Sequence, residues 1–447
     1  MQMNTLIENG RLNLGNGSTN HAQGFAAEME TSASDLRRRY QVVRTLSERL
    51  CETLETEDYV IQTMPEASPT KWHLAHTSWF FETFLLQPNI ANYQSAHPQY
   101  NYLFNSYYNA VGPFHCRPKR GLLSRPTVRE VYEYRKYVDG LMLELLDHAN
   151  AEKLASLEPR ITLGLNHEQQ HQELMLTDLK HVFSENPLRP IYRQRGEAKV
   201  NPVLPMRWFG FEEGIHAIGN KGSGFRYDNE EPFHRVFTDS FLLSSRLVTN
   251  GEYLAFIQDG GYRRPELWLS LGWNVVKERA WQAPLYWEKQ VCDWRIMTLA
   301  GMRDLCLEEP VCHVSFFEAD AYARWSGVRL PSEEEWEIAA SGVAVEGNFV
   351  DNEVFHPTAL DSEPSGLAQM FGDLWEWTRS PYSPYPGYAP VSGALGEYNG
   401  KFMCNQFVLR GGSCATSKSH IRPTYRNFFP PDARWQFTGF RLAKDLK

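Results

Sequence analysis

The sequence predicts an α plus α+β protein in two parts, a four-helix bundle followed by a loop-rich α+β domain. The first observation is length, because 447 residues are too many for one ordinary core. The second is a helical recurrence of apolar side chains from residue 34 to about 185. The third is a change beyond about 205, where apolar runs shorten and turn signals such as Gly260-Gly261 and Asn399-Gly400 multiply.

Four helices are predicted in the first part from apolar residues three or four positions apart. They cover residues 36–50, 69–84, 128–146 and 161–183. Ser68-Pro69 marks the start of the second helix, with serine as the N-cap and proline at the first helical position. A long connection over about 88–125 separates the second helix from the third, which fits a bundle with one long crossover.

The chain is predicted to divide into a mobile arm, a helical bundle, a linker and an α+β domain. Their bounds are 1–35, 36–185, 186–205 and 206–447. The arm is rich in Asn, Gly, Ser and Thr, and prolines mark the linker. In the α+β domain we expect short helices near 249–258 and 315–325. Another begins at Ser332, where Glu335 completes a capping box.

Composition and charge narrow the class of protein. Apolar content of 42% and charged content of 22% are those of a soluble globular chain. A net charge of −9 argues against non-specific nucleic-acid binding, and no apolar run approaches the ~20 residues that cross a bilayer. The first residues lack a secretory pattern, and the seven cysteines contain no C-x-x-C pair. We therefore expect a cytoplasmic protein with no nucleic-acid and no membrane partner.

Residues 167–171, H-E-Q-Q-H, match the H-E-x-x-H signature of zinc peptidases. His167 and His171 are four positions apart, so on a helix they face one way and can bind one cation. Imidazole suits Zn, Fe, Cu and Ni, so the pair does not select the metal. A polar face on a bundle helix is the alternative.

The peptidase interpretation requires a further ligand downstream. The extended signature needs glycine and histidine where this chain has Leu174 and Thr177. A downstream helical glutamate is the other choice, but Glu185 lies near the helix end and Glu197 lies beyond two prolines. We therefore expect Glu168 to be an ordinary carboxylate on the helix surface.

A better third ligand lies upstream, in S-P-T-K-W-H-L-A-H-T at 68–77. His76 shares a helical face with Trp72 and Trp79, so it points toward the bundle core. A lone core histidine is usually a packing residue, but a histidine pair on a neighbouring helix favours metal ligation. His73 is the competing choice, on an adjacent face that we expect to be more exposed.

These residues give the chain a resemblance to a known family. W-H-L-A-H at 72–76 and L-N-H-E-Q-Q-H-Q-E-L at 165–174 resemble the DinB-type bundle of the sulfoxide synthases of ergothioneine biosynthesis, the EgtB family. The second part resembles a formylglycine-generating-enzyme-type domain with a C-type-lectin-like fold. That match is carried by E-P-F-H-R-V at 231–236, V-T-N-G-E-Y at 248–253, R-L-P-S-E-E-E-W-E at 329–337, G-D-L-W-E-W-T at 372–378, L-R-G-G-S at 409–413 and G-F-R-L-A at 439–443.

The resemblance implies O2-dependent C–S bond formation on Fe(II). In that reaction a thiol, cysteine or γ-glutamylcysteine, is joined to C2 of the imidazole of hercynine (Nα-trimethylhistidine), and the sulfur leaves as a sulfoxide. The iron ligands would be His76, His167 and His171. Iron can reduce O2 stepwise, which redox-inactive zinc cannot.

The same resemblance implies substrate-binding residues. Gln170 shares the ligand face and corresponds to a glutamine that hydrogen-bonds hercynine. Arg117 and Arg120, in F-H-C-R-P-K-R-G, correspond to arginines that hold the carboxylate of the thiol substrate, a role suited to the planar guanidinium. The alternatives are a bundle-core amide for Gln170 and a solvated basic patch for the arginines.

Two adjacent tyrosines, Tyr107 and Tyr108, are candidates for the donor of a proton or an electron that favours the sulfoxide over simple thiol oxidation. Family enzymes use a tyrosine in this role. Some place it in the C-terminal domain, where Tyr398 is a weaker candidate. Packing of the domain interface is the alternative role for the adjacent pair.

Asn427-Phe428-Phe429 stands where members that use γ-glutamylcysteine tend to have N-W-D. Phe428 can attract a quaternary ammonium through its ring face. Phe429 removes the carboxylate that would bind the glutamyl amine, so free cysteine is the expected thiol donor. Core packing is the alternative for both phenylalanines.

Other functions compete with this one. Formylglycine generation requires a close cysteine pair after R-G-G-S, and here only Cys414 follows Ser413. An ovothiol-type 5-histidylcysteine sulfoxide synthase, which sulfurises C5 of histidine, is the nearest rival, although such enzymes usually carry an extra methyltransferase domain. A non-catalytic lectin-like binding protein is the third. Nothing in the sequence indicates the oligomeric state.

Overall fold

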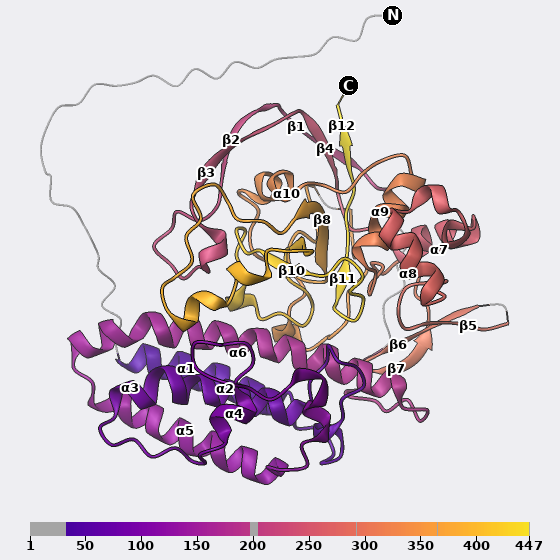
Figure 1. Ribbon diagram of the computed structural model, residues 1–447. Helices are drawn as coiled ribbons and strands as arrows, with labels where there is room; N and C mark the ends of the chain where they lie inside the picture. Colours follow the sequence, from indigo (N-terminus) through magenta and orange to yellow (C-terminus); the bar gives the residue numbers. More distant parts are fainter. Residues whose placement is uncertain (1–32, 197–203, 292, 364, 447) are drawn as a thin grey trace, which may run out of the picture.

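The computed structural model describes residues 33–446, apart from 197–203, 292 and 364. Figure 1 shows a helical part lying against a larger part that contains the labelled strands. The predicted fold class, a helical bundle followed by an α+β part, is confirmed. The predicted mobile arm falls outside the described residues, except for 33–35, which belong to the first helix. In the described part of the chain, no helix combines the length and apolar character that crossing a membrane requires.

The described helical part contains four long helices and two short ones. They are α1 (Ala33–Arg49), α2 (Thr70–Phe81), α3 (Gln87–Asn89), α4 (Tyr100–Phe104), α5 (Val128–His148) and α6 (Ala151–Glu185). One π-helical turn, Glu82–Leu86, joins α2 to α3. The core between the long helices is apolar, with side chains such as Tyr40, Trp79, Val138 and Ile161 at most 1% exposed. The helix-period pattern of the sequence therefore corresponds to real buried faces.

The predicted start of α2 is wrong by one position. Pro69, not Ser68, takes the N-cap position, and no side chain caps the helix. The reason is that Ser68 is bound elsewhere. Its backbone N–H donates to Asp178 and its hydroxyl accepts from Arg120.

The predicted start of α6 is also wrong, since the helix begins at Ala151 rather than at residue 161. The side chain of Asn150 caps it by accepting from the Lys153 backbone N–H. Pro159 lies inside the helix, where a proline usually marks a boundary. Leu154 and Leu157 pack into the bundle core and hold these first turns in place.

The described residues of the C-terminal part form four small sheets with strand orders β10-β9-β8-β11, β1-β4-β12, β2-β3 and β5-β6-β7. The strands are β1 (Trp208–Phe211), β2 (Gly214–Ile218), β3 (His234–Thr238), β4 (Phe241–Ser244), β5 (Trp287–Lys289), β6 (Trp294–Thr298), β7 (Gly301–Asp304), β8 (Trp375–Pro381), β9 (Phe407–Arg410), β10 (Asn427–Phe429), β11 (Thr438–Gly439) and β12 (Ala443–Asp445). Strand β11 pairs with β8 in parallel, and the other pairings in these sheets are antiparallel.

Four α-helices are present among these sheets in the described part of the chain. They are α7 (Asn250–Gln258), α8 (Ser270–Glu278), α9 (Phe316–Trp325) and α10 (Glu333–Ala340). The three predicted short helices are confirmed as α7, α9 and α10, and each begins with a capping box. The capping serine and glutamate of α10 are Ser332 and Glu335, as the sequence predicts. Helix α8 was outside the prediction.

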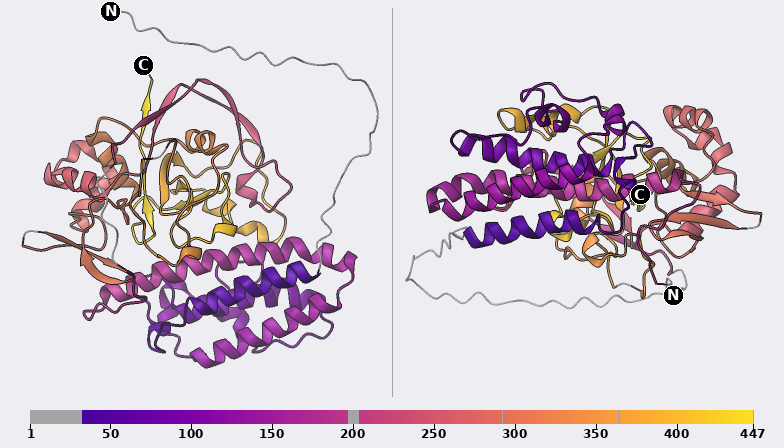
Figure 2. Two further views of the ribbon diagram at one scale, coloured as in Figure 1. Left: turned by 180° about the vertical axis from the view of Figure 1, so that it is seen from behind. Right: turned by 90° about the horizontal axis from the view of Figure 1, so that it is seen from below.

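Helix α6 lies between the rest of the bundle and the C-terminal part (Figures 1 and 2). One of its faces packs on α1 and α2. The other hydrogen-bonds to the C-terminal part, where Gln170 donates to Tyr425 and Glu173 accepts from Trp375. A residue on α6 can therefore belong to a site that both parts build.

Candidate metal centre and substrate cavity

Three histidines from two helices meet in the bundle core. His76 comes from α2, and His167 and His171 come from α6. One nitrogen from each ring lies within 4.8 Å of the others, and all three residues are buried. The Nε2 atoms of His76 and His167 are 3.2 Å apart. The sequence pattern predicts this convergence, because the i, i+4 pair on α6 faces the inward side of α2.

Hydrogen bonding and stacking fix the orientation of His76. Its Nδ1 lies 2.5 Å from the carbonyl oxygen of Phe104. A carbonyl can only accept, so Nδ1 carries the proton and Nε2 presents a lone pair. The ring is stacked on those of Trp72 and Trp79, with distances between ring centroids of 4.6 Å and 5.4 Å.

The three imidazoles fit a metal ion. Burial lowers the pKa of each ring, to about 4 for His167, so all three are neutral near pH 7. Neutral imidazole is the form that binds metals, and converging lone pairs in a dry core favour a cation between them. The Nδ1 of His167 has no hydrogen-bond partner in the described part of the chain. The ligand set suits several transition metals and does not by itself select one.

His73, the competing third ligand, lies outside this group. It is 2% exposed, so the expectation of a more exposed face is wrong. Its ring nitrogens hydrogen-bond to His171 Nδ1, at 2.8 Å, and to Asp178 Oδ2, at 3.1 Å. The reason is that every residue of α2 is buried, so the position of a residue around the helix does not predict whether it is exposed to solvent.

Glu168 requires a second correction, because the predicted surface carboxylate is 0% exposed. It accepts hydrogen bonds from Arg44, at 2.9 Å, from Arg135, at 2.6 Å, and from Ser47, at 2.6 Å. Burial alone raises the pKa of Glu168, but the Arg135 and Arg44 guanidiniums outweigh it and lower the pKa to about 2. Glu168 therefore joins α6 to α1 and α5 through buried ion pairs.

A cavity of about 390 Å³ lies beside the histidines, between the bundle and the C-terminal part. Its volume is in the range of small-molecule sites. Most of the predicted substrate and catalytic residues line it. They are Tyr107, Arg117, Arg120, Gln170, Asn427, Phe428 and Phe429, together with His171 of the histidine group.

Arg120 is a buried cation without an anionic partner. It is 3% exposed and forms no ion pair within 4 Å with the described residues. Its Nη atoms donate to the hydroxyls of Ser68, at 2.9 Å, and Ser106, at 3.1 Å, while its Nε has no described partner. Its guanidinium carbon lies 3.3 Å from the ring centroid of Trp72. Burial and the neighbouring Arg117 lower the pKa of Arg120, although the nearby Asp178 carboxylate raises it in part, so an anionic ligand would stabilise its charge.

The two predicted tyrosines separate in the structure. Tyr107 lines the cavity, its ring 5.9 Å from that of Tyr398, and its buried hydroxyl has no partner among the described residues. Burial raises the pKa of Tyr107, so the phenol is protonated near neutral pH. Tyr108 lies in the bundle core, 5.7 Å from Trp79 and 5.3 Å from Phe84, and does not line the cavity.

The amide of Gln170 is held by two tyrosines of the C-terminal part. Its Nε2 donates to the Tyr425 hydroxyl at 2.7 Å, and its Oε1 accepts from the Tyr398 hydroxyl. Tyr425 is held in turn by His420, at 3.0 Å, and His420 by Asn166, at 2.9 Å. One amide hydrogen of Gln170 stays available for a ligand.

Residues 427–429 form strand β10 on the cavity wall. Phe428 stacks on Tyr382 at 4.1 Å, and Phe429 meets Trp435 at 6.0 Å. The carboxylate among the lining residues is Glu173. It accepts from Trp375, Ser413 and Thr416, so its oxygens are already engaged.

Several cavity residues were missed from the sequence. They are Glu173, Tyr227, Asn229, Trp375, Tyr425 and Gln436. Trp375 lies within the G-D-L-W-E-W-T motif, and Tyr425 opens the stretch Y-R-N-F-F-P-P, so these motifs serve the site as well as the fold. Buried Asn229 Oδ1 and Gln436 Nε2 have no described hydrogen-bond partner, which marks them as further polar contacts for a ligand.

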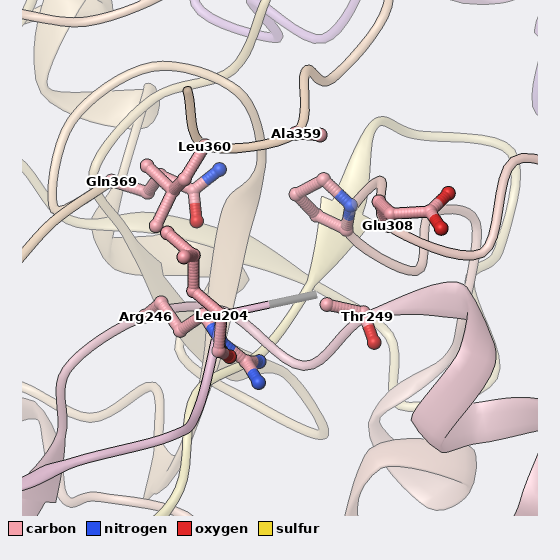
Figure 3. Close-up of a pocket in the computed structure, with 8 residues that line it drawn as sticks. Leu204, Arg246, Thr249, Glu308, Ala359, Leu360 and Gln369 are labelled. Atoms are coloured by element: carbon pink, nitrogen blue, oxygen red, sulfur yellow. The ribbon is translucent and has the colours of Figure 1, made fainter. Parts of the chain in front are cut away.

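A second hollow lies among Leu204, Arg246, Thr249, Leu360 and Gln369 (Figure 3). It encloses about 10 Å³, which is room for roughly one water molecule. The cavity beside the histidines is therefore the better candidate for a substrate site.

Comparison with known proteins agrees with this architecture. The model of the sulfatase-modifying factor enzyme 1-like domain matches residues 211–360 and 355–446. Hercynine oxygenase of Mycolicibacterium smegmatis is 32% identical, over 89% of this chain and 96% of its own. The hercynine oxygenase of Mycobacterium tuberculosis is 30% identical, over 86% and 92%. The formylglycine-generating enzyme of Streptomyces coelicolor is 29% identical, over 52% of this chain and 87% of its own.

The matches cover both parts of the chain, and they confirm the resemblance that the motifs indicate. By sequence and by architecture, the chain belongs to the hercynine oxygenase family, the EgtB-type enzymes of ergothioneine biosynthesis.

Proposed function

We propose that this protein is a sulfoxide synthase that uses Fe(II) and O2 to join free cysteine to C2 of the hercynine imidazole, giving hercynylcysteine sulfoxide for ergothioneine biosynthesis. The observation that carries the proposal is the buried Arg120, which forms no described ion pair, in a cavity that lies beside three converging neutral histidines and is lined by one of them, His171. Arg120 suits the carboxylate of an amino acid, and the three histidines suit a redox metal. The names of the most similar relatives support the same reaction.

His76, His167 and His171 would hold the iron. Iron held by three neutral ligands supplies stepwise reduction of O2 and leaves positions open for substrates. Within the protein, the Phe104 carbonyl keeps the bare Nε2 of His76 turned inward. Trp72 and Trp79 cover both faces of that ring and exclude water from it.

Arg120 and Arg117 bind the carboxylate of the thiol donor. The Ser68 and Ser106 hydroxyls and the Trp72 ring hold the Arg120 guanidinium in one plane, which suits a two-point contact with a carboxylate. Arg117 is more exposed and lies at the same wall. Its charge adds to the attraction.

The lack of a free carboxylate supports cysteine over γ-glutamylcysteine. A glutamyl amine needs an acceptor, preferably a carboxylate, and residue 429 is phenylalanine. Glu173 is less suited to this role, since Trp375 and two hydroxyls already donate three hydrogen bonds to its oxygens.

Gln170 and Phe428 bind hercynine. Tyr398 and Tyr425 fix the Gln170 amide, so its remaining N–H can donate to the imidazole. Phe428, stacked on Tyr382, presents an aromatic ring to the trimethylammonium group.

Tyr107 is the proton donor. Its protonated hydroxyl is buried without a partner and lies at the cavity, so it can supply a proton to charge that develops on the oxidised sulfur or oxygen. Tyr108 contacts the bundle core instead and is the less suitable of the two.

The experiment is anaerobic reconstitution with Fe(II), addition of hercynine and cysteine, and then exposure to O2. We expect the adduct sulfoxide by mass spectrometry, with sulfur at C2 by NMR, and a higher kcat/KM for cysteine than for γ-glutamylcysteine. Adduct formation at C5 of histidine would assign the ovothiol-type reaction. Ligand binding without turnover would assign a binding protein. A clear preference for the dipeptide would overturn the choice of thiol donor.

A further inference from the structure

Two buried side chains, His73 and Asp178, follow the proposed metal ligand His171 in a series of hydrogen bonds. The Nδ1 of His73 lies 2.8 Å from the Nδ1 of His171. The Nε2 of His73 lies 3.1 Å from Oδ2 of Asp178. His73 is 2% exposed and Asp178 is 3% exposed, so water does not compete for these hydrogen bonds.

The donor and acceptor properties of Asp178, His73 and His171 determine where the protons lie in this series of hydrogen bonds. A carboxylate only accepts, so His73 Nε2 carries a proton and donates to Asp178. The Nδ1 of a neutral His73 then accepts, and the proton between the two rings belongs to His171 Nδ1. This leaves His171 Nε2 without a proton and free to bind a cation.

The fold holds both ends of this series of hydrogen bonds in place. His171 and Asp178 are seven positions apart on α6, so they lie two turns apart on nearly the same face. His73 lies on α2, one turn before the ligand His76. The Ser68 backbone N–H donates to the same Asp178 oxygen at 2.8 Å, which anchors the carboxylate.

We propose that His73 and Asp178 are positioning residues for the metal centre, which hold His171 in the tautomer and orientation that turn its bare Nε2 to the metal. The pair would raise the basicity of the ligand in the way that carboxylate–histidine–metal arrangements do. This proposal rests on the metal site of the proposed function, and it is tested without turnover.

The test is titration of the metal-free protein with Co(II), following the visible absorption of the bound ion. Asp178→Asn places an amide that can donate to His73 and so reverse both tautomers, and His73→Leu removes the connection. Each should raise the Kd for Co(II) by roughly 10- to 100-fold and change the absorption bands. His73→Gln can accept from His171 and donate to Asp178, so it should restore the Kd to within about threefold of the wild-type value.

His181 offers a matched control. It lies on α6 near Asp178 and hydrogen-bonds Thr63 at 2.7 Å. His181→Leu should leave Co(II) affinity unchanged. Equal losses in this control would show a general loosening of α6 and overturn the proposal, as would wild-type affinity and spectra in both Asp178→Asn and His73→Leu.

Folding is checked by circular dichroism and Tm, and Asp178→Asn, which preserves shape, decides the question where His73→Leu does not fold. A wild-type protein that binds no metal would contradict the proposed function as well. Co(II) binding by Asp178→Asn and His73→Leu as tight as that of the wild-type protein would contradict this inference alone.

Discussion

Two buried clusters of charge in the bundle are organised in opposite ways. Around Glu168, two guanidiniums and a hydroxyl satisfy one carboxylate. Around Arg120, two serine hydroxyls and a tryptophan ring hold one guanidinium, and no carboxylate of the described residues forms an ion pair with it. The first cluster is complete without a ligand, whereas the second becomes complete when an anion binds. The comparison distinguishes buried charge that stabilises the fold from buried charge reserved for a substrate.

The largest effect should come from removing a proposed metal ligand. His167→Ala deletes one of three donors, so we expect sulfoxide formation to fall below detection and bound iron to fall with it. Product is measured by mass spectrometry and iron by elemental analysis. Full activity in this variant would remove His167 from the proposed ligand set.

Breaking the complete cluster should affect stability most. Glu168→Gln leaves the buried Arg44 and Arg135 with only their more exposed partners, Asp139 and Glu48, so the free energy of unfolding should fall by about 3 kcal/mol in denaturant titrations. Glu133→Gln, at an exposed i, i+4 pair with Arg129, is the control and should change little. An unaffected Glu168→Gln protein would show that the ion pairs do not stabilise the fold.

The same cluster predicts a pH dependence. The pKa of Glu168 is about 2 in the folded protein, below its ordinary value of 4.5. Its contribution is therefore present in full above about pH 4.5 and is lost as the pH falls toward 2. The difference in unfolding free energy between wild type and Glu168→Gln should shrink across this window, and a constant difference would contradict the assignment.

Breaking the incomplete cluster should affect binding instead. Arg120→Met removes a desolvated charge that forms no described ion pair in the free protein, so stability should be equal or higher. The KM for cysteine should rise roughly 10- to 100-fold, which corresponds to the free energy that a hydrogen bond to a charged group contributes. Steady-state kinetics tests the expected rise in KM, and thermal unfolding of the same preparation tests the expected stability. Loss of stability with an unchanged KM would show that Arg120 stabilises the fold and does not bind the substrate.

The smallest expected effect is a change of product ratio. Tyr107→Phe should keep binding but divert turnover toward thiol oxidation, because the buried proton donor is gone. Tyr108→Phe, in the adjacent core position, is the matched control and should keep the wild-type ratio. The ratio of sulfoxide to oxidised thiol is measured by mass spectrometry, and identical ratios in both variants would exclude Tyr107.

Periodicity predicted much of the fold because buried faces repeat along a helix. It placed the four long helices and brought His76 toward His167 and His171. It failed for Glu168 and His73, since both lie on helices that are buried on more than one side. The partner of Glu168 in α1, Arg44, is 124 positions away, and no local pattern announces such a pair.

The substrate side of the site was predicted through motifs rather than periodicity. Gln170 was found on the ligand face, but its partner Tyr425 is 255 positions away and belongs to the other part of the chain. Tyr107 and Tyr108 are indistinguishable in sequence, and only packing separates a cavity residue from a core residue. Contacts of this range depend on tertiary structure, which no short window of sequence contains.

The position of α6 between the two parts also sets an order of assembly. His76 and His167 are 91 positions apart and meet within the bundle, whereas Glu173 and Ser413 are 240 positions apart. During synthesis from the N-terminus, residues 151–185 emerge long before their C-terminal partners, and long loops close late. The three histidines can thus meet while Gln170 and Glu173 still face water, so the newborn chain can acquire its metal pocket before it acquires a place for substrate.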